Sequence, residues 1–231
     1  MFLTRNGMRL VLDVQLSSGK QHASVHAKAA LGRLLDELGD KRPALVRGDS
    51  GYGNEGILLE LEQRGQPYLL RLRQTANVQR LVAQQFGRQD WSRPDSQGCQ
   101  MVEAHLKLHG WSQQRRVVIV RQRVRGSLAR ERRIDGRQLR LELAPSVHEG
   151  ERLWEYAVLV SNAAYPLEAI AQLYRDRADA ENGFDELKNQ WGLGGLTTQD
   201  MNRCQSTARA CALVYNWWSW YCRAAHPHAR L

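Results

Sequence analysis

The feature that most constrains this chain is a long helical pattern near its C-terminal end, over residues 166–188. It opens with proline, which is tolerated in the first turn of a helix. At 3.6 residues per turn, one stripe of a single continuous helix then carries four polar side chains: Tyr174, Arg177, Glu181 and Lys188. An apolar stripe runs beside it: Leu173, Ala180, Phe184 and Leu187. The pattern predicts a packed helix that presents a charged edge.

The composition predicts a folded, soluble, cytoplasmic protein. The chain has 231 residues and 42% hydrophobic residues, enough for one substantial core and too many for a disordered chain. No apolar run approaches the roughly 20 residues of a membrane span, and no signal peptide opens the chain. The cysteines show no CxxC pair, which favours buried thiols in a reducing compartment. They are Cys99, Cys204, Cys211 and Cys222.

The positive charge is concentrated in one segment. The net charge is +9, but the segment Arg71–Arg140 holds sixteen Arg or Lys against five Asp or Glu, a local charge of +11. Such a block indicates a polyanionic partner, with nucleic acid first; the alternative is an Arg-rich surface that only keeps the protein soluble. Three alternating arginines within the block are candidate DNA contacts: Arg121, Arg123 and Arg125.

The N-terminal residues predict a β-hairpin followed by a helix. Asn6-Gly7 separates two short alternating runs, which is a strong hairpin signal. The second run, residues 8–17, places Leu10, Leu12, Val14 and Leu16 on one face. Asp13 lies on the other, mostly polar face and is interpreted as a solvated strand residue. Residues 25–38 have the apolar spacing of an amphipathic helix.

Asp49 follows a short buried-strand pattern, residues 43–48, and precedes a Gly-rich turn. Asn54 can then cap a helix that ends near Arg64, and residues 67–72 form the next strand. An acid at the carboxyl end of a strand is a natural metal or substrate ligand in an open α/β sheet. The alternative is an Asp that only makes the turn.

The middle of the chain is predicted to be rich in strands. The β-like runs are residues 100–108, 115–124, 138–143 and 153–160. Trp91, Trp111 and Trp154 are interpreted as half-buried packing residues, with base stacking as the alternative. Residues 201–222 have apolar side chains at spacings of three and four, which predicts one helix. Its aromatic tail, residues 215–221, is expected to pack as core or to cover the helix predicted over residues 166–188.

The two candidate acids gain weight from a resemblance. The spacing Tyr174-x2-Arg177-x3-Glu181-x6-Lys188 resembles the signature helix of the DDE transposases of bacterial insertion sequences, and Arg47-Gly-Asp-Ser-Gly-Tyr resembles their second-carboxylate motif. The resemblance implies that Asp49 and Glu181 are catalytic, metal-binding carboxylates. It also implies that Tyr174, Arg177 and Lys188 hold transposon-end DNA. Without it, Arg177 and Glu181 would be interpreted as a solvated i,i+4 pair.

The family resemblance also implies a fold, a chemistry and partners. The expected fold is α/β, a ribonuclease-H-like mixed sheet with flanking helices and a basic β-rich insertion. The expected divisions are 1–74, 75–160 and 161–231. Expected ligands are Mg²⁺ or Mn²⁺, which suit hard carboxylate oxygens. Expected partners are double-stranded DNA, as transposon ends and target, and a second copy in a homodimer on DNA, with the protein on the bacterial nucleoid when bound.

Two departures from the family pattern stand out. The first catalytic Asp has no convincing counterpart, so we expect an N-terminally truncated fragment that is inactive alone; the alternative is that Asp13 is that acid. Gly183 stands where the family commonly has a larger residue, and glycine costs about 1 kcal/mol in a helix interior. Three functions stay open: a DDE transposase fragment, a non-catalytic DNA-binding relic that occupies transposon ends or pairs with an intact copy, and an unrelated ribonuclease-H-like nuclease.

Overall fold

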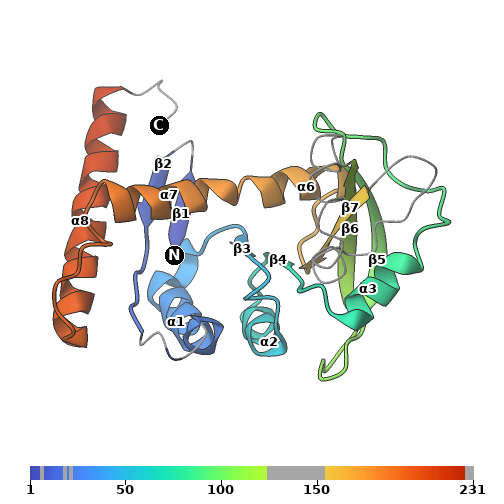
Figure 1. The fold of residues 1–231 in the computed structure, drawn as a ribbon, viewed down its shortest axis with the longest axis horizontal. Helices are drawn as coiled ribbons and strands as arrows, with labels where there is room; N and C mark the ends of the chain where they lie inside the picture. Colours follow the sequence, from blue (N-terminus) through green and yellow to red (C-terminus); the bar gives the residue numbers. More distant parts are fainter. Residues whose placement is uncertain (6–7, 18–19, 21–22, 124–153, 227–231) are drawn as a thin grey trace, which may run out of the picture. The chain divides into compact units, whose positions relative to one another are not determined.

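The structure, a computed structural model, forms two compact units (Figure 1). It describes residues 1–5, 8–17, 20, 23–123 and 154–226. Unit 1 combines the two ends of the chain, Met1–Pro43 and Asp176–Leu231, and unit 2 is the continuous segment Ala44–Arg175. The predicted division at residues 75 and 160 stays a prediction, and the units are described one at a time.

The described residues of unit 2 form a mixed five-stranded sheet of order β3-β4-β7-β6-β5. β3 and β4 are parallel, and the other three neighbouring pairs are antiparallel. The strands are β3 (Val46–Gly48), β4 (Tyr68–Arg71), β5 (Gln100–Leu106), β6 (Arg115–Arg123) and β7 (Trp154–Ser161). The β-rich middle of the chain therefore continues the sheet that β3 and β4 begin.

Helices cover both faces of this sheet. On one face, Ile170 and Ala171 of α6 (Leu167–Arg175) pack against Leu69, Val118 and Leu159 of the strands (Figure 1). Successive strand residues point to opposite faces, so Tyr68 points away from α6. Its hydroxyl donates to Glu62 of α2 (Glu55–Gln63) at 2.7 Å, which places α2 on the other face, and α3 (Ala76–Ala83) contacts β7.

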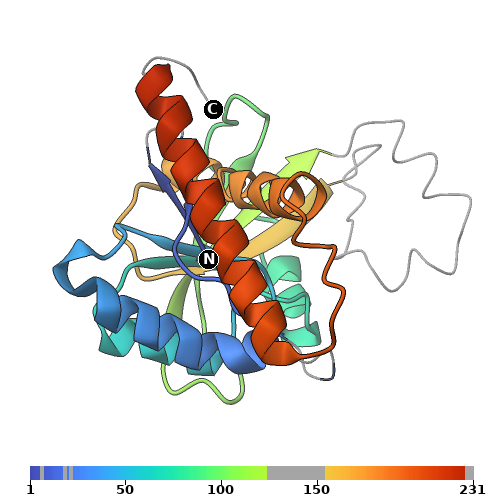
Figure 2. The same cartoon turned by 90° about the vertical axis from the view of Figure 1, so that its left-hand side faces the viewer.

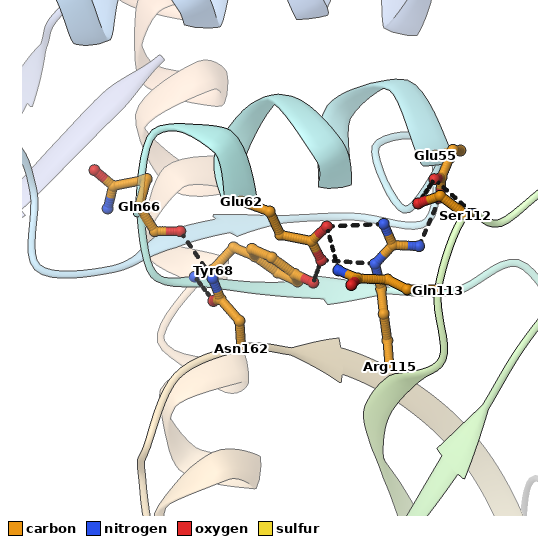
Figure 3. A network of polar contacts seen from close by, with 8 residues as sticks. All are labelled: Glu55, Glu62, Gln66, Tyr68, Ser112, Gln113, Arg115 and Asn162. Atoms are coloured by element: carbon orange, nitrogen blue, oxygen red, sulfur yellow. Dashed lines mark hydrogen bonds and ion pairs between the residues drawn. The ribbon is translucent and has the colours of Figure 1, made fainter.

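A buried arginine ties α2 to β6 (Figure 3). Arg115 is 3% exposed; its Nε donates to Glu62 Oε1 at 2.6 Å and its Nη1 to Glu55 Oε2 at 2.6 Å. Burial by itself would raise the pKa of Glu62, but hydrogen bonds from Arg115 and Tyr68 outweigh it and leave the pKa below its usual 4.5. The network keeps both carboxylates charged inside the fold.

The described residues of unit 1 form a hairpin, a short 3-10 turn and three helices. The elements are β1 (Phe2–Arg5), β2 (Met8–Val11), α1 (Ala23–Leu38), η1 (Gly39–Lys41), α7 (Ala178–Asn189) and α8 (Met201–Ala225). Val11, Leu187, Ala212 and Tyr215 form its core, with Phe2 packed against them. The hairpin therefore depends on α7 and α8 for its burial.

Side-chain amides join α8 to β2 and to the segment after it. The Asn216 amide mimics a neighbouring strand: its Oδ1 accepts from Val11 N at 2.7 Å and its Nδ2 donates to Val11 O at 2.8 Å. Gln205 repeats the arrangement with Leu16 N, at 2.8 Å, and Val14 O, at 2.7 Å. These bonds satisfy backbone groups that a third strand would otherwise pair.

Several sequence predictions are confirmed. β1 and β2 pair with Arg5 opposite Met8, although the Asn6-Gly7 turn lies outside the described residues. Asn54 caps α2, its side chain accepting from Ile57 N at 3.2 Å. Three of the four β-like runs are strands, and the fourth, residues 138–143, lies outside the described residues. All four cysteines are free, and two of them are buried.

Other predictions are wrong. β2 ends at Val11, not near residue 17, and Val11 is the buried residue, because the hairpin packs that face against α7 and α8. Helix α3 was not predicted. The aromatic tail is core only in part: Tyr215 is buried, whereas Trp217 of α8 is 72% exposed and Trp220 is 59% exposed. Among the described helices, none combines the length and apolar character needed to cross a membrane.

Candidate active site

Asp49 lies directly after β3, at the carboxyl end of a strand that pairs in parallel with β4. The side chain is exposed, and its Oδ1 accepts from Gly51 N at 2.8 Å. The backbone carbonyl of Asp49 accepts from Tyr52 N at 3.1 Å. Among the described residues, none donates a hydrogen bond to Oδ2, so the turn uses one carboxylate oxygen and leaves the other for a ligand.

The turn that carries Asp49 is held against β4. A Cβ added to Gly53 would collide with the Arg71 carbonyl oxygen, and one added to Gly48 would lie 2.9 Å from a Leu70 methyl carbon. Arg47, the residue before Gly48, donates from Nη1 to Leu173 O at the end of α6, at 2.7 Å. Close backbone approach thus explains the glycines, and tertiary contacts fix the acid.

The charge of Asp49 affects the pKa of the neighbouring Tyr52. Burial is the main cause that raises the pKa of Tyr52, and the carboxylate of Asp49 adds to it. The phenol therefore stays protonated beside the acid throughout the physiological range. It contributes an apolar ring and a neutral hydroxyl to the surroundings of this carboxylate.

The predicted signature helix is two helices, which corrects the expectation of one continuous helix. α6 ends at Arg175, a turn covers Asp176 and Arg177, and α7 begins at Ala178. The break coincides with the boundary between the two units. Tyr174 belongs to α6, where it packs partly buried against the apolar cluster of unit 2. The four signature side chains therefore do not come from one helix.

Glu181 and Lys188 share an exposed face of α7. The Glu181 side chain is 61% exposed, and its Oε1 accepts from Arg177 Nη2 at 2.6 Å. Together with Phe184 and Asp185, Glu181 and Lys188 line a shallow, open hollow. The apolar stripe is only partly confirmed, because Leu187 is buried and Phe184 is 45% exposed. The three polar signature positions of unit 1 thus lie within one short segment.

The far end of α7 is anchored by a polar contact that sequence reasoning missed. Glu186 accepts from Arg9 Nη2 of β2 at 2.5 Å and from the Tyr215 hydroxyl of α8 at 3.1 Å. Burial first, and the charge of Glu186 second, raise the pKa of Tyr215 to about 12. Partners this distant in sequence leave no signal in spacing or composition.

The structure explains why residue 183 is glycine. A Cβ at this position of α7 would lie 2.8 Å from the ring of Phe2, which stacks edge-on against Phe184 at 4.9 Å between ring centroids. Glycine therefore lets the hairpin ring approach α7 closely. Gly183, which departs from the family pattern, is therefore the residue that lets the hairpin pack against α7.

The arginines predicted to contact DNA differ in their surroundings. The Arg121 guanidinium lies between two indoles, 4.0 Å from the ring centre of Trp91 and 4.4 Å from that of Trp154. This cation–π stack has a packing role, as predicted for the two tryptophans. Arg123 is exposed, and Arg125 lies outside the described residues. Contact of these arginines with DNA stays a prediction.

Asp13 lies in the extended segment after β2, with its side chain partly exposed. Its Oδ2 accepts from Gln15 Nε2 at 3.0 Å, and its backbone carbonyl accepts from the amino group of Met1. It also lines an open pocket with residues of α1 and α8, including Arg33, Glu37 and Arg209. Its role as a first acid stays a prediction, as does the pairing of Asp49, in unit 2, with Glu181, in unit 1.

Fold and site residues together define a mixed α/β protein with an exposed, fixed acid at a strand end and a second exposed acid on a helix. The family model described as "Transposase DDE domain" matches residues 1–217, and the chain belongs to that family. A search of curated proteins gave no match. Membership indicates a role in DNA transposition, with DNA as partner, in a family that uses divalent metal ions.

Proposed function

We propose that this protein is the transposase of a bacterial insertion sequence, which cuts and joins DNA strands on a ribonuclease-H-like sheet. Asp49 and Glu181 are assigned as two of its metal-binding carboxylates. The observation that carries the assignment is the position of Asp49, at the end of β3 in a turn clamped to β4. The family match over residues 1–217 supports the reaction class.

The donor set fits a hard divalent cation. Asp49 is exposed, with Oδ1 held by the Gly51 amide, and Glu181 is exposed, with Oε1 held by Arg177. Carboxylate oxygens are the ligands that Mg²⁺ and Mn²⁺ prefer. When bound, such ions neutralise the charge that develops on the attacking and leaving oxygens of a phosphodiester. These two residues would hold them, together with a further acid.

The other signature residues have roles on the DNA. Lys188 shares the exposed hollow on α7 with Glu181, so it can neutralise a phosphate beside the acid. Arg177 orients the Glu181 carboxylate through its ion pair and adds positive charge next to it. Tyr174, Arg123 and Arg125 are assigned to the DNA backbone as well. Within residues 1–231, the candidate for the third acid is Asp13.

The proposal predicts a carboxylate-dependent metal site in the full chain. Mn²⁺ binding, followed by the electron paramagnetic resonance of the free ion, should weaken roughly tenfold or more in Asp49→Ala and in Glu181→Ala, since each removes a ligand. Glu168→Ala is the matched control: Glu168 is exposed in the first turn of α6 and does not line the hollow of Glu181, so Mn²⁺ binding should not change. Equal affinity in all four proteins would contradict the assignment.

DNA cleavage then separates the open alternatives. Metal-dependent cleavage of duplex DNA that disappears in Asp13→Ala identifies Asp13 as the third acid. Metal binding without cleavage, in a chain that still binds duplex DNA, favours the non-catalytic relic. Cleavage of RNA in an RNA–DNA hybrid, without cleavage of DNA duplexes, would identify a ribonuclease-H-like nuclease instead.

A further inference from the structure

The outer side of α8 carries a large apolar surface that the described chain leaves open. Figure 2 shows the course of α8. The exposed large side chains are Leu213 (71%), Val214 (46%), Trp217 (72%), Trp218 (49%), Trp220 (59%) and Tyr221 (59%). Exposed apolar patches larger than a few hundred Å² are uncommon on monomeric proteins and indicate an interaction site.

The surface has the spacing of a helix–helix seam. Leu213, Trp217 and Trp220 lie at intervals of four and three, and Ala210 and Ala224 continue the same alternation in each direction; all five are exposed. We name these five residues the outer row. Alternating intervals of three and four are the a/d pattern by which one helix packs along another. The inner side of α8 follows a different set, including Ala208, Ala212 and Tyr215, which packs within unit 1.

The sizes of the side chains along the outer row are symmetric about its centre. It runs from a small residue, Ala210, through three large ones to a small residue, Ala224. Read in either direction, it places large side chains at the centre and small ones at the ends. When a second copy of α8 packs against the first across a two-fold axis, the large side chains of one outer row therefore lie opposite the large side chains of the other.

The area is sufficient for a specific contact. Large aromatic side chains present about 150–250 Å² each, so Trp217 and Trp220, with Tyr221 beside the row, contribute roughly 290–480 Å² at their exposed fractions. Leu213 and Val214 add to this. A standard interface buries about 800 Å² per partner. The outer row and the side chains beside it thus supply about half of one side of such an interface.

The outer row itself contains no charged side chain. A platform for single-stranded DNA combines stacked aromatics with basic residues along one groove, and here the aromatics stack on one another instead, as Trp218 does on Tyr221 at 5.6 Å between ring centroids. Tryptophan and tyrosine are also the residues that most often dominate protein–protein interfaces.

We propose that α8 is a dimerisation helix, in which the outer row of one copy packs against the outer row of a second copy. The inference rests on α8 alone and does not depend on metal binding or DNA cleavage. It assigns a location to the homodimer that the sequence suggested, and it predicts that dimers form without DNA.

Sedimentation of the full chain without DNA, over concentrations from below to well above micromolar, tests the proposal. The wild type should show a monomer–dimer equilibrium. Trp217→Gln/Trp220→Gln should raise the dimer dissociation constant roughly tenfold or more, because it removes the central anchors while glutamine keeps the helix favourable. Val25→Gln is the matched control, since Val25 is 61% exposed on α1, outside the row, and dimerisation should stay unchanged.

Far-UV circular dichroism establishes that each variant is folded, and Leu213→Gln provides a second, smaller disruption of the same row. A wild type that stays monomeric at every concentration would overturn the proposal. So would a dimer that is weakened equally by the control, or not at all by the row variants. A monomeric wild type that loses single-stranded DNA binding in Trp217→Gln/Trp220→Gln would assign the surface to nucleic acid.

Discussion

The two candidate acids are held in contrasting ways. Asp49 sits in a turn pressed against β4, where a single added methyl group at Gly53 would strike backbone. Glu181 is an exposed helical residue whose recorded partner, Arg177, lies four residues away. One acid is positioned by the tertiary structure and the other by its own helix. In the proposed site, one ligand would therefore be fixed by the fold and the other would be adaptable.

The same contrast separates the units that carry them. Unit 2 has a continuous sheet covered on both faces and a buried polar network around Arg115. Unit 1 contains a hairpin that packs the ring of Phe2 closely against Gly183. Side-chain amides of α8 also make hydrogen bonds to the hairpin backbone. We therefore expect substitutions to cost more where they meet the backbone or buried charge of unit 2 than where they meet movable side chains of unit 1.

The largest effect should follow from Arg115→Ala. Removing a 3%-exposed guanidinium leaves Glu62 and Glu55 without their cation, and breaking a buried pair costs roughly 3 kcal/mol of unfolding free energy. Urea denaturation measures it. The pKa of Glu62 is lower in the folded protein than its usual 4.5. The charged Glu62 therefore contributes fully to the unfolding free energy above pH 4.5, and this contribution is lost as the pH falls through the pKa of Glu62 in the folded protein. The difference between wild type and variant should therefore narrow in acid.

Arg115→Met/Glu62→Gln is the control for this substitution. It removes the pair while keeping similar volume, so it should recover part of the loss. A loss below about 0.5 kcal/mol in Arg115→Ala, the level of a surface pair, would contradict the view that unit 2 depends on this network.

A smaller effect should follow from Gly53→Ala. The new methyl group meets the Arg71 carbonyl, which belongs to the sheet and cannot move aside, so we expect a loss of about 1–3 kcal/mol. Mn²⁺ affinity should fall as well, because the Asp49 turn must shift. Gly87→Ala is the matched control: nothing lies within 4 Å of the added carbon, and its stability should change by a few tenths of a kcal/mol. Equal stability of the two variants would contradict the close contact inferred between the Asp49 turn and β4.

The smallest effect should come from Gly183→Ala. Replacing glycine within α7 favours the helix by about 1 kcal/mol, whereas the added carbon displaces the Phe2 ring, whose outer atoms lie 2.8 Å away. The ring is the end of a side chain that can rotate, so the two contributions should cancel to within about 1 kcal/mol. Thermal unfolding measures the difference. A loss as large as that of Gly53→Ala would show that the hairpin contact is as rigid as the sheet.

Local patterns predicted the local structure well. The Asn54 cap, the strand before Asp49 and the hairpin strands were all recoverable, because each depends on neighbours in sequence. The break between α6 and α7 was not, since Asp176 and Arg177 are ordinary helix residues and nothing in their spacing ends a helix.

Long-range packing explains the remaining errors. Val11 is buried because α7 and α8 cover its face of the hairpin, and alternation alone assigned the core to the face of Leu10. The aromatic tail of α8 has the spacing of a core stripe, yet its outer row is exposed. Apolar periodicity identifies a surface that needs a partner, but it does not say whether that partner lies in the same chain.

The division of unit 1 between the two ends of the chain has a consequence for synthesis. The backbone of Val11 is completed by the side chain of Asn216, 205 residues later. At roughly 5–20 residues per second, the hairpin waits about 10–40 s for that partner, while the continuous segment of unit 2 emerges in between and can fold first. During translation, the hairpin residues are therefore made well before their native partners, and until α8 is made their unpaired edge is open to pairing with other chains.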